Sequence, residues 1–101
     1  MGEVYGHLSV NPRGISIGDD YLTIYEYDSG MAMETDAGFV GRGGSSIERP
    51  YSGEGADQVV TQITWASSPH WFKRDLLIVL YVGENEQIIN FLAENLALFA
   101  G

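Results

Sequence analysis

Residues 76–82, with the sequence LLIVLYV, form the longest apolar run in the chain and constrain its fold most strongly. A strand with one solvent-facing side alternates apolar and polar residues, whereas this run is apolar at every position, so both of its faces need cover. Its seven residues are far fewer than the roughly 20 that a membrane-spanning helix needs. We therefore predict a central strand here, buried on both sides.

Further segments have the alternation or the β-branched and aromatic composition of strands, and turn sequences rich in Gly, Pro, Asn, Asp and Ser separate them. Residues 31–35 give a weaker strand signal, and glycines weaken the signal within 39–48. The predicted strands are residues 3–10, 15–17, 21–27, 31–35, a segment within 39–48, 58–66 and 71–82.

Helical periodicity predicts one long helix over residues 84–98, with Asn85 as its cap. Its apolar stripe consists of Ile88, Ile89, Leu92, Leu96 and Phe99. Phe91 and Leu98 flank this stripe and widen it. Either the helix sits deep in a groove or its edge meets a second subunit.

The predicted fold class is α+β, with six or seven short, mostly antiparallel strands closed by one C-terminal amphipathic helix. The segments GHLSVNPRGISIGDDYLTIYEYDSG and DLLIVLYVGENEQIINFLAENL follow the element order of the pleckstrin-homology-like superfamily, which the chain resembles in this respect. The resemblance implies two orthogonally packed antiparallel sheets, closed at one end by the helix. A cystatin-like or another sheet-plus-helix fold matches the same order.

Length and composition predict a single domain over residues 1–101 that folds without disulfides, because the chain has no cysteine. The net charge is −9, divided as −6 over residues 1–41, zero over 42–75 and −3 over 76–101. Such a surface disfavours direct binding to nucleic acid or to anionic lipid. The N-terminus has no secretory signal pattern, so we expect a cytoplasmic protein with no membrane contact.

Residues 38–58 contain six glycines and little periodicity, and we interpret them as a mobile loop within the domain. Arg42 and Arg49 make an anion contact the functional alternative for this loop. The phosphate-loop pattern is absent, since no lysine follows the glycines. If the loop has a function, it acts as a lid or an anion cradle.

The candidate partner-binding surface is the strand at 21–27, YLTIYEY. Alternation places Leu22 and Ile24 in the core and the tyrosines on the outer face. Tyrosine suits an interface because its ring contributes apolar area and its hydroxyl can still find a partner. The predicted partner-binding residues are Tyr5, Tyr21, Tyr25, Glu26, Tyr27 and Asp28. Tyrosines that only cover an outer sheet face, or that pack under the loop at 38–58, are the alternative.

Motifs for catalysis or metal binding are not recognisable. His7 and His70 are the only histidines and have no second ligand at metal-site spacing. The serines lack a nucleophile-elbow context, and the acids around the strand at 21–27 lack the calcium-loop pattern. Trp65 and Trp71 are expected to cap one end of the core. We expect no metal and no cofactor.

The sequence therefore favours a small, non-catalytic module or inhibitor that binds a protein with a basic surface, in the manner of acidic proteins that mimic nucleic-acid charge. Homodimerisation through a sheet edge or a helix flank is a second prediction. The alternative function is a small-ligand or enzymatic domain that uses residues 38–58 as a lid.

Overall fold

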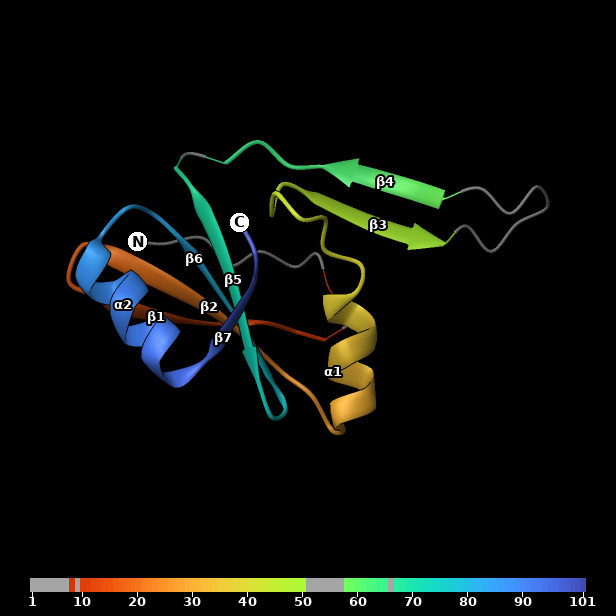
Figure 1. The fold of residues 1–101 in the computed structure, drawn as a ribbon, viewed down its shortest axis with the longest axis horizontal. Helices are drawn as coiled ribbons and strands as arrows, with labels where there is room; N and C mark the ends of the chain where they lie inside the picture. The colour runs from red at the N-terminus through yellow and green to blue at the C-terminus, as the bar shows by residue number, and fades with distance from the viewer. Residues whose placement is uncertain (1–7, 9, 51–57, 66) are drawn as a thin grey trace.

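The computed structural model describes residues 8, 10–50, 58–65 and 67–101. They form seven strands and two helices (Figure 1). In chain order these are β1 Arg13–Ile17, β2 Asp20–Glu26, α1 Gly30–Ala37, β3 Ser46–Pro50, β4 Gln58–Gln62, β5 Pro69–Arg74, β6 Leu77–Val82, α2 Glu86–Asn95 and β7 Ala97–Ala100.

Five of the strands make one antiparallel sheet in the order β1-β2-β6-β5-β7. β6 is the middle strand, and its residues Ile78 to Tyr81 are at most 4% exposed. Ile78 and Leu80 pack on one face, whereas Val79 and Tyr81 pack on the other. The prediction of a central strand covered on both sides is confirmed.

Helix α2 covers one face of the sheet. The Asn85 side chain caps it, as predicted, by accepting a hydrogen bond from the backbone N–H of Gln87. The cluster beneath the helix contains Leu22, Phe72, Val79, Tyr81, Ile88 and Leu92. Phe91 is 61% exposed, so the helix does not sit deep in a groove.

The helix is shorter than predicted, because it ends at Asn95 and the chain continues into β7. Leu98 and Phe99 thus belong to a strand. β7 adds to the sheet beside β5 and becomes its edge. Phe99 follows Leu96 by three residues and so matches the helical spacing in the sequence, although the helix has already ended at Asn95.

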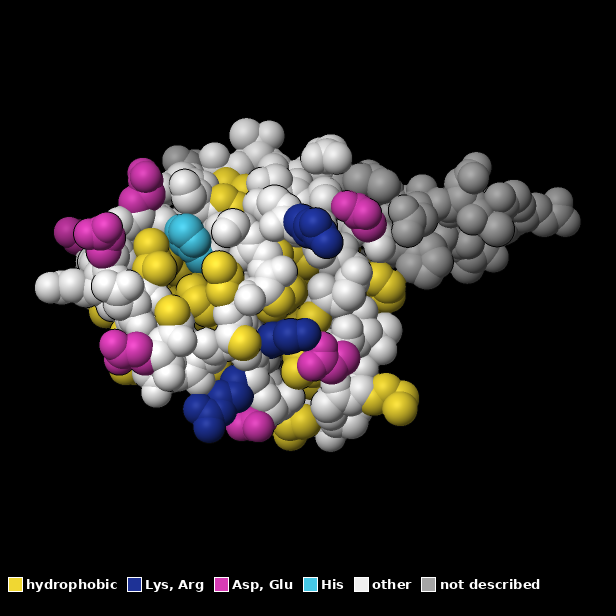
Figure 2. All heavy atoms as spheres, viewed as in Figure 1, with side chains coloured by type: hydrophobic (Ala, Val, Ile, Leu, Met, Phe, Trp, Pro, Cys, Tyr) yellow, Lys and Arg dark blue, Asp and Glu magenta, His cyan; other side chains and the backbone are white. Residues whose placement is uncertain are grey.

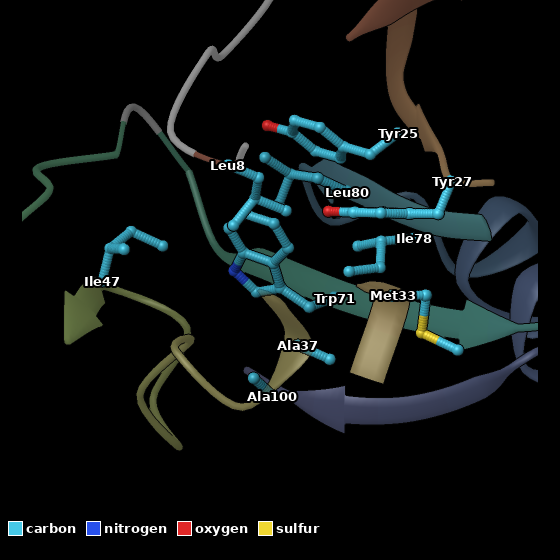
Figure 3. Packing of buried hydrophobic residues seen from close by; sticks show 10 residues of the cluster. All are labelled: Leu8, Tyr25, Tyr27, Met33, Ala37, Ile47, Trp71, Ile78, Leu80 and Ala100. Carbon is cyan, nitrogen blue, oxygen red and sulfur yellow. The ribbon is translucent and has the colours of Figure 1, made fainter. Parts of the chain in front are cut away.

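The opposite face of the sheet is covered by α1 and by the segment that leads from α1 to β3 (Figure 1). Figure 3 shows the side chains that meet there, with the Trp71 indole among them. The cluster consists of Leu8, Tyr25, Tyr27, Met33, Ala37, Ile47, Trp71, Ile78, Leu80 and Ala100. Both faces of the sheet are therefore used for folding.

The prediction of a strand at residues 31–35 is wrong, since this segment lies within α1. The Ser29 hydroxyl caps the helix by accepting a hydrogen bond from the N–H of Ala32 at 3.1 Å. Met33, Asp36 and Ala37 are the buried residues, at helical spacing. Met31 and Met33 alternate with smaller or polar residues, as in a strand, and the segment is too short to distinguish the two-residue period of a strand from the roughly 3.6-residue period of a helix.

β5 and β6 form a hairpin where the sequence predicted no turn. Arg74 pairs with Leu77, so Asp75 and Leu76 make a two-residue turn. Asp75 has a φ of 53°, a left-handed conformation that aspartate tolerates better than most residues. This turn separates β5 from the apolar run, whose first residue, Leu76, is 40% exposed.

The segment 38–58 differs from the expected loop. β3 and β4 pair over residues 46–50 and 58–62 as an antiparallel hairpin that projects from the body of the molecule (Figure 1). Ile47 at its base is 3% exposed and belongs to the core. Residues 51–57, and the greater part of the strand predicted at 3–10, lie outside the described residues.

The fold class is α+β with antiparallel strands, as the sequence predicted; the strands form a five-stranded and a two-stranded sheet, and α1 is a helix in addition to the predicted C-terminal one. The resemblance to the pleckstrin-homology-like superfamily stays a prediction.

The contrast between Leu92 and Phe91 tests how α2 is seated. Leu92 is 3% exposed, so Leu92→Ala is expected to lower the free energy of unfolding by about 2–5 kcal/mol through cavity formation. Phe91→Ala, at 61% exposure, is expected to change it by less than about 0.5 kcal/mol. Denaturant titration measures both values. Equal losses would contradict the packing of α2 described here.

Candidate functional site

The tyrosine-bearing face predicted for β2 does not exist as a free surface. Tyr25 is fully buried and Tyr27 is 3% exposed, so the prediction that both stand outward is wrong. Tyr25 stacks on Trp71 with ring centroids 6.1 Å apart, and the Tyr27 hydroxyl donates to Asp36 Oδ2 at 2.8 Å. The reason is the cover that α1 and the segment before β3 place on this face.

Three of the predicted partner-binding residues remain at the surface. Glu26 and Asp28 are exposed, and Tyr21 is half-buried. The Tyr21 ring lies across Gly14 of the neighbouring strand, where a side chain would collide with it. Tyr5 lies outside the described residues. The surviving surface is therefore the border between β1 and β2, not the face of β2.

β1 is an edge strand that is exposed along its whole length. Among the described residues it pairs only with β2, through the register Arg13 with Ile24 to Ile17 with Asp20. All five of its residues are exposed, including Ile15 at 46% and Ile17 at 42%. Natural proteins usually protect such an edge with lysine, proline, a bulge or a covering segment. Two exposed isoleucines on an open edge mark β1 as a candidate interaction site.

Carboxylates stand at both ends of β1. Asp19 lies in the two-residue turn to β2, while Glu26 and Asp28 lie beyond the other end of the pairing. Arg13 is the cation of this strand, and its guanidinium is 3.4 Å from the Glu26 carboxylate. Both side chains are largely exposed, so this pair contributes little to stability. The edge is apolar in its middle and acidic at its ends.

A second polar cluster lies where β2, β6 and α2 meet. The Tyr81 hydroxyl donates to Asp20 Oδ1 at 2.7 Å and accepts from the Asn85 N–H at 3.1 Å. His70 stacks on the Tyr81 ring at 6.0 Å. Burial, and then the hydrogen bond to Asp20, raises the pKa of the Tyr81 hydroxyl. Tyr81 stays protonated near neutral pH, and its hydrogen bonds join β2 to the start of α2, which is a structural role.

Trp65 and Trp71 hold the segment before β3 in place. The carbonyl oxygen of Gly44 accepts a hydrogen bond from each indole, at 3.0 Å from Trp65 and 2.9 Å from Trp71. The N–H of Gly101 also donates to the Arg42 carbonyl at 2.9 Å. The glycine pattern contained no sign of this double contact, which needs two residues distant in sequence. The base of the predicted loop is therefore attached to the core.

The two arginines proposed for anion contact do not form a described site. Arg42 is exposed, and the Arg49 side chain lies outside what the structure describes. A hollow of about 420 Å³ lies instead beside the start of β7, with Lys73 and Arg74 in its lining. Glu34, Asp75 and Glu94 line it too, so carboxylates outnumber the cations and do not favour an anion.

Within the described residues, no group of three or more His, Asp or Glu side chains is placed to hold a metal ion. In the same part of the chain, no helix has the length and apolar character needed to cross a membrane. The chain matches no protein-family model, no curated protein and no solved structure.

The contrast between Gly44 and Gly43 tests the attachment of the predicted loop. Gly44 has a φ of 75°, and a Cβ there would lie 3.0 Å from Trp71 Cδ1. Gly44→Ala is therefore expected to lower the free energy of unfolding by about 1–3 kcal/mol. A Cβ on Gly43 has no atom within 4 Å, so Gly43→Ala is expected to change it by less than about 0.5 kcal/mol.

Thermal or denaturant unfolding of the two variants measures the difference. Equal stabilities would show that residues 42–45 are a slack connector, as the glycine content alone suggested.

Proposed function

We propose that this chain is a protein-binding module that accepts an extended, basic segment of its partner along the open edge of β1. The observation that carries the proposal is the exposure of all five residues of an edge strand between acidic ends. This keeps the acidic, partner-binding role predicted from the sequence and moves it from the face of β2 to the adjoining edge.

Strand addition suits this edge because, in an antiparallel pair, every second residue of β1 directs its backbone N–H and C=O groups away from β2. An added strand satisfies such groups through main-chain hydrogen bonds, while alternate side chains give specificity. Arg13, Ile15 and Ile17 share the α2 side of the sheet, since they are opposite Ile24, Leu22 and Asp20. Apolar side chains of the partner strand would pack against the two isoleucines.

Charge favours a partner with lysine or arginine on either side of its apolar residues. Asp19 would lie near one end of the added strand, and Glu26 with Asp28 near the other. The net charge of −9 also attracts a basic segment over a longer range and speeds its encounter with the edge. This attraction is screened as salt is added.

The alternative, a small-ligand or enzymatic domain with residues 38–58 as a lid, has less support. A lid needs a hinge, and the base of this segment is held by the Gly44 carbonyl and by Ile47 in the core. The described hollow lies at β7 and is lined neither by Arg42 nor by His70.

A short synthetic peptide that alternates lysine and valine tests the proposal. We expect it to bind with an affinity that falls as salt rises, and to shift the backbone amide NMR signals of β1 more than those of other strands. A peptide of the same charge with proline in place of valine lacks every second backbone N–H and the β-branched side chains, so it does not form a regular ladder and should bind at least about tenfold more weakly.

Two variants with equal charge change serve as the matched pair. Glu26→Lys lies beside β1 and should weaken binding mainly through a slower association rate. Glu94→Lys changes an exposed acid of α2, away from β1, and should have a much smaller effect. The proposal would be contradicted if the two variants had equal effects or if the two peptides bound with equal affinity. Either result would show that the binding is general charge attraction.

A further inference from the structure

β7 forms the other edge of the sheet; Ala97 and Leu98 are exposed there, whereas Ala100 is buried and the next residue, Gly101, donates to the Arg42 carbonyl. Among the described residues, β7 pairs only with β5 and ends the strand order on that side. Leu98 in this strand is 54% exposed, and Phe91 of the preceding helix is 61% exposed. Large apolar side chains with this exposure beside an unpaired strand are a recognised aggregation or interaction hazard.

Leu98 lies on the face of the sheet that α2 covers. It is paired with Phe72, whose side chain belongs to the cluster under the helix. Figure 2 shows hydrophobic side chains gathered over the part of the surface where α2 and β7 lie. Leu98, at the edge of β7, and Phe91, on α2, thus both lie on the side of the sheet that α2 covers.

The sequence that contains β7 is uncharged, unlike the ends of β1. Residues 95–101 contain no charged side chain. The nearby cations are already paired, Lys73 with Glu34 and Arg74 with Asp75. A molecule with a net charge of −9 repels a second copy over most of its surface. Glu94 lies near the start of β7, so the part of the edge around Leu98 is where two copies can approach without charged side chains in the contacting strands.

We infer that β7 is a homodimer edge, at which β7 pairs antiparallel with β7 of a second copy. A two-fold axis perpendicular to the sheet joins the two five-stranded sheets into one and keeps both α2 helices on the same face. Leu98 from each copy then lies at the centre of the contact, with Phe91 at its border. This inference is independent of the partner proposed for β1.

The two proposed interfaces are expected to respond to salt in opposite directions. The β7 contact consists of apolar burial and main-chain hydrogen bonds between two acidic molecules, so added salt screens repulsion and strengthens dimerisation. The β1 contact joins opposite charges, so added salt weakens it. The dimer can therefore be tested without any partner peptide, and either proposal can fail alone.

Sedimentation of the full chain from low to high micromolar concentration tests the dimer. We expect a monomer–dimer equilibrium that shifts toward dimer in high salt. Leu98→Lys brings two like charges together at the axis and should raise the dissociation constant at least about tenfold. Met31→Lys introduces the same charge at an 82% exposed position on α1 and should leave it unchanged.

Chemical cross-linking adds a measurement that does not depend on disrupting the contact. The chain has no cysteine, so Leu98→Cys and Met31→Cys each provide a single thiol for a bifunctional maleimide. We expect a cross-linked dimer for Leu98→Cys only. The inference would be overturned by a monomer at every concentration or by a dimer that Leu98→Lys does not affect. Equal cross-linking of both variants, or growth into larger chains through β1 and β7, would also overturn it.

Discussion

The structure depends on covering both faces of β6. Its residues Ile78 to Tyr81 alternate between two clusters, and each cluster needs its own covering layer. Helix α2 provides one layer, while α1 and the segment held at Gly44 provide the other. Among the described residues, this arrangement leaves β1 and β7 without a further strand beside them. The interaction surfaces we propose follow from that arrangement, since the faces serve folding and the edges remain open.

The same constraint explains what sequence could and could not predict. The apolar run at 76–82 and the cap at Asn85 are local signals, and both led to correct elements. The orientation of Tyr25 and Tyr27 was not predictable from β2 alone. Alternation separates two faces but does not say whether the second is covered, and here the cover comes from distant segments. Likewise, eight residues of α1 with one short alternating stretch do not reveal a helix without knowledge of where it packs.

The sequence predicted the acidic residues of the candidate site better than it predicted where on the sheet the site lies. Glu26 and Asp28 are exposed as expected, whereas the sequence pattern does not indicate a role for the exposed isoleucines of β1. An edge is a property of strand order, and strand order depends on contacts between segments far apart in sequence. The two edges also differ in charge, because carboxylates lie at the ends of β1 whereas β7 lies in a stretch without charged side chains. The net charge of the whole chain does not show this difference. This difference is the basis for assigning them different occupants.

Amide hydrogen exchange followed by NMR tests most directly whether the edges, and not the faces, carry the interactions. In the dilute chain we expect slow exchange in β6 and faster exchange in β1 and β7. Protection should rise in β7 as the protein concentration increases, and in β1 when the lysine–valine peptide is added. Protection that rises instead on α1 or on the outer surface of α2, with both edge strands unchanged, would contradict the division of the molecule into structural faces and interacting edges.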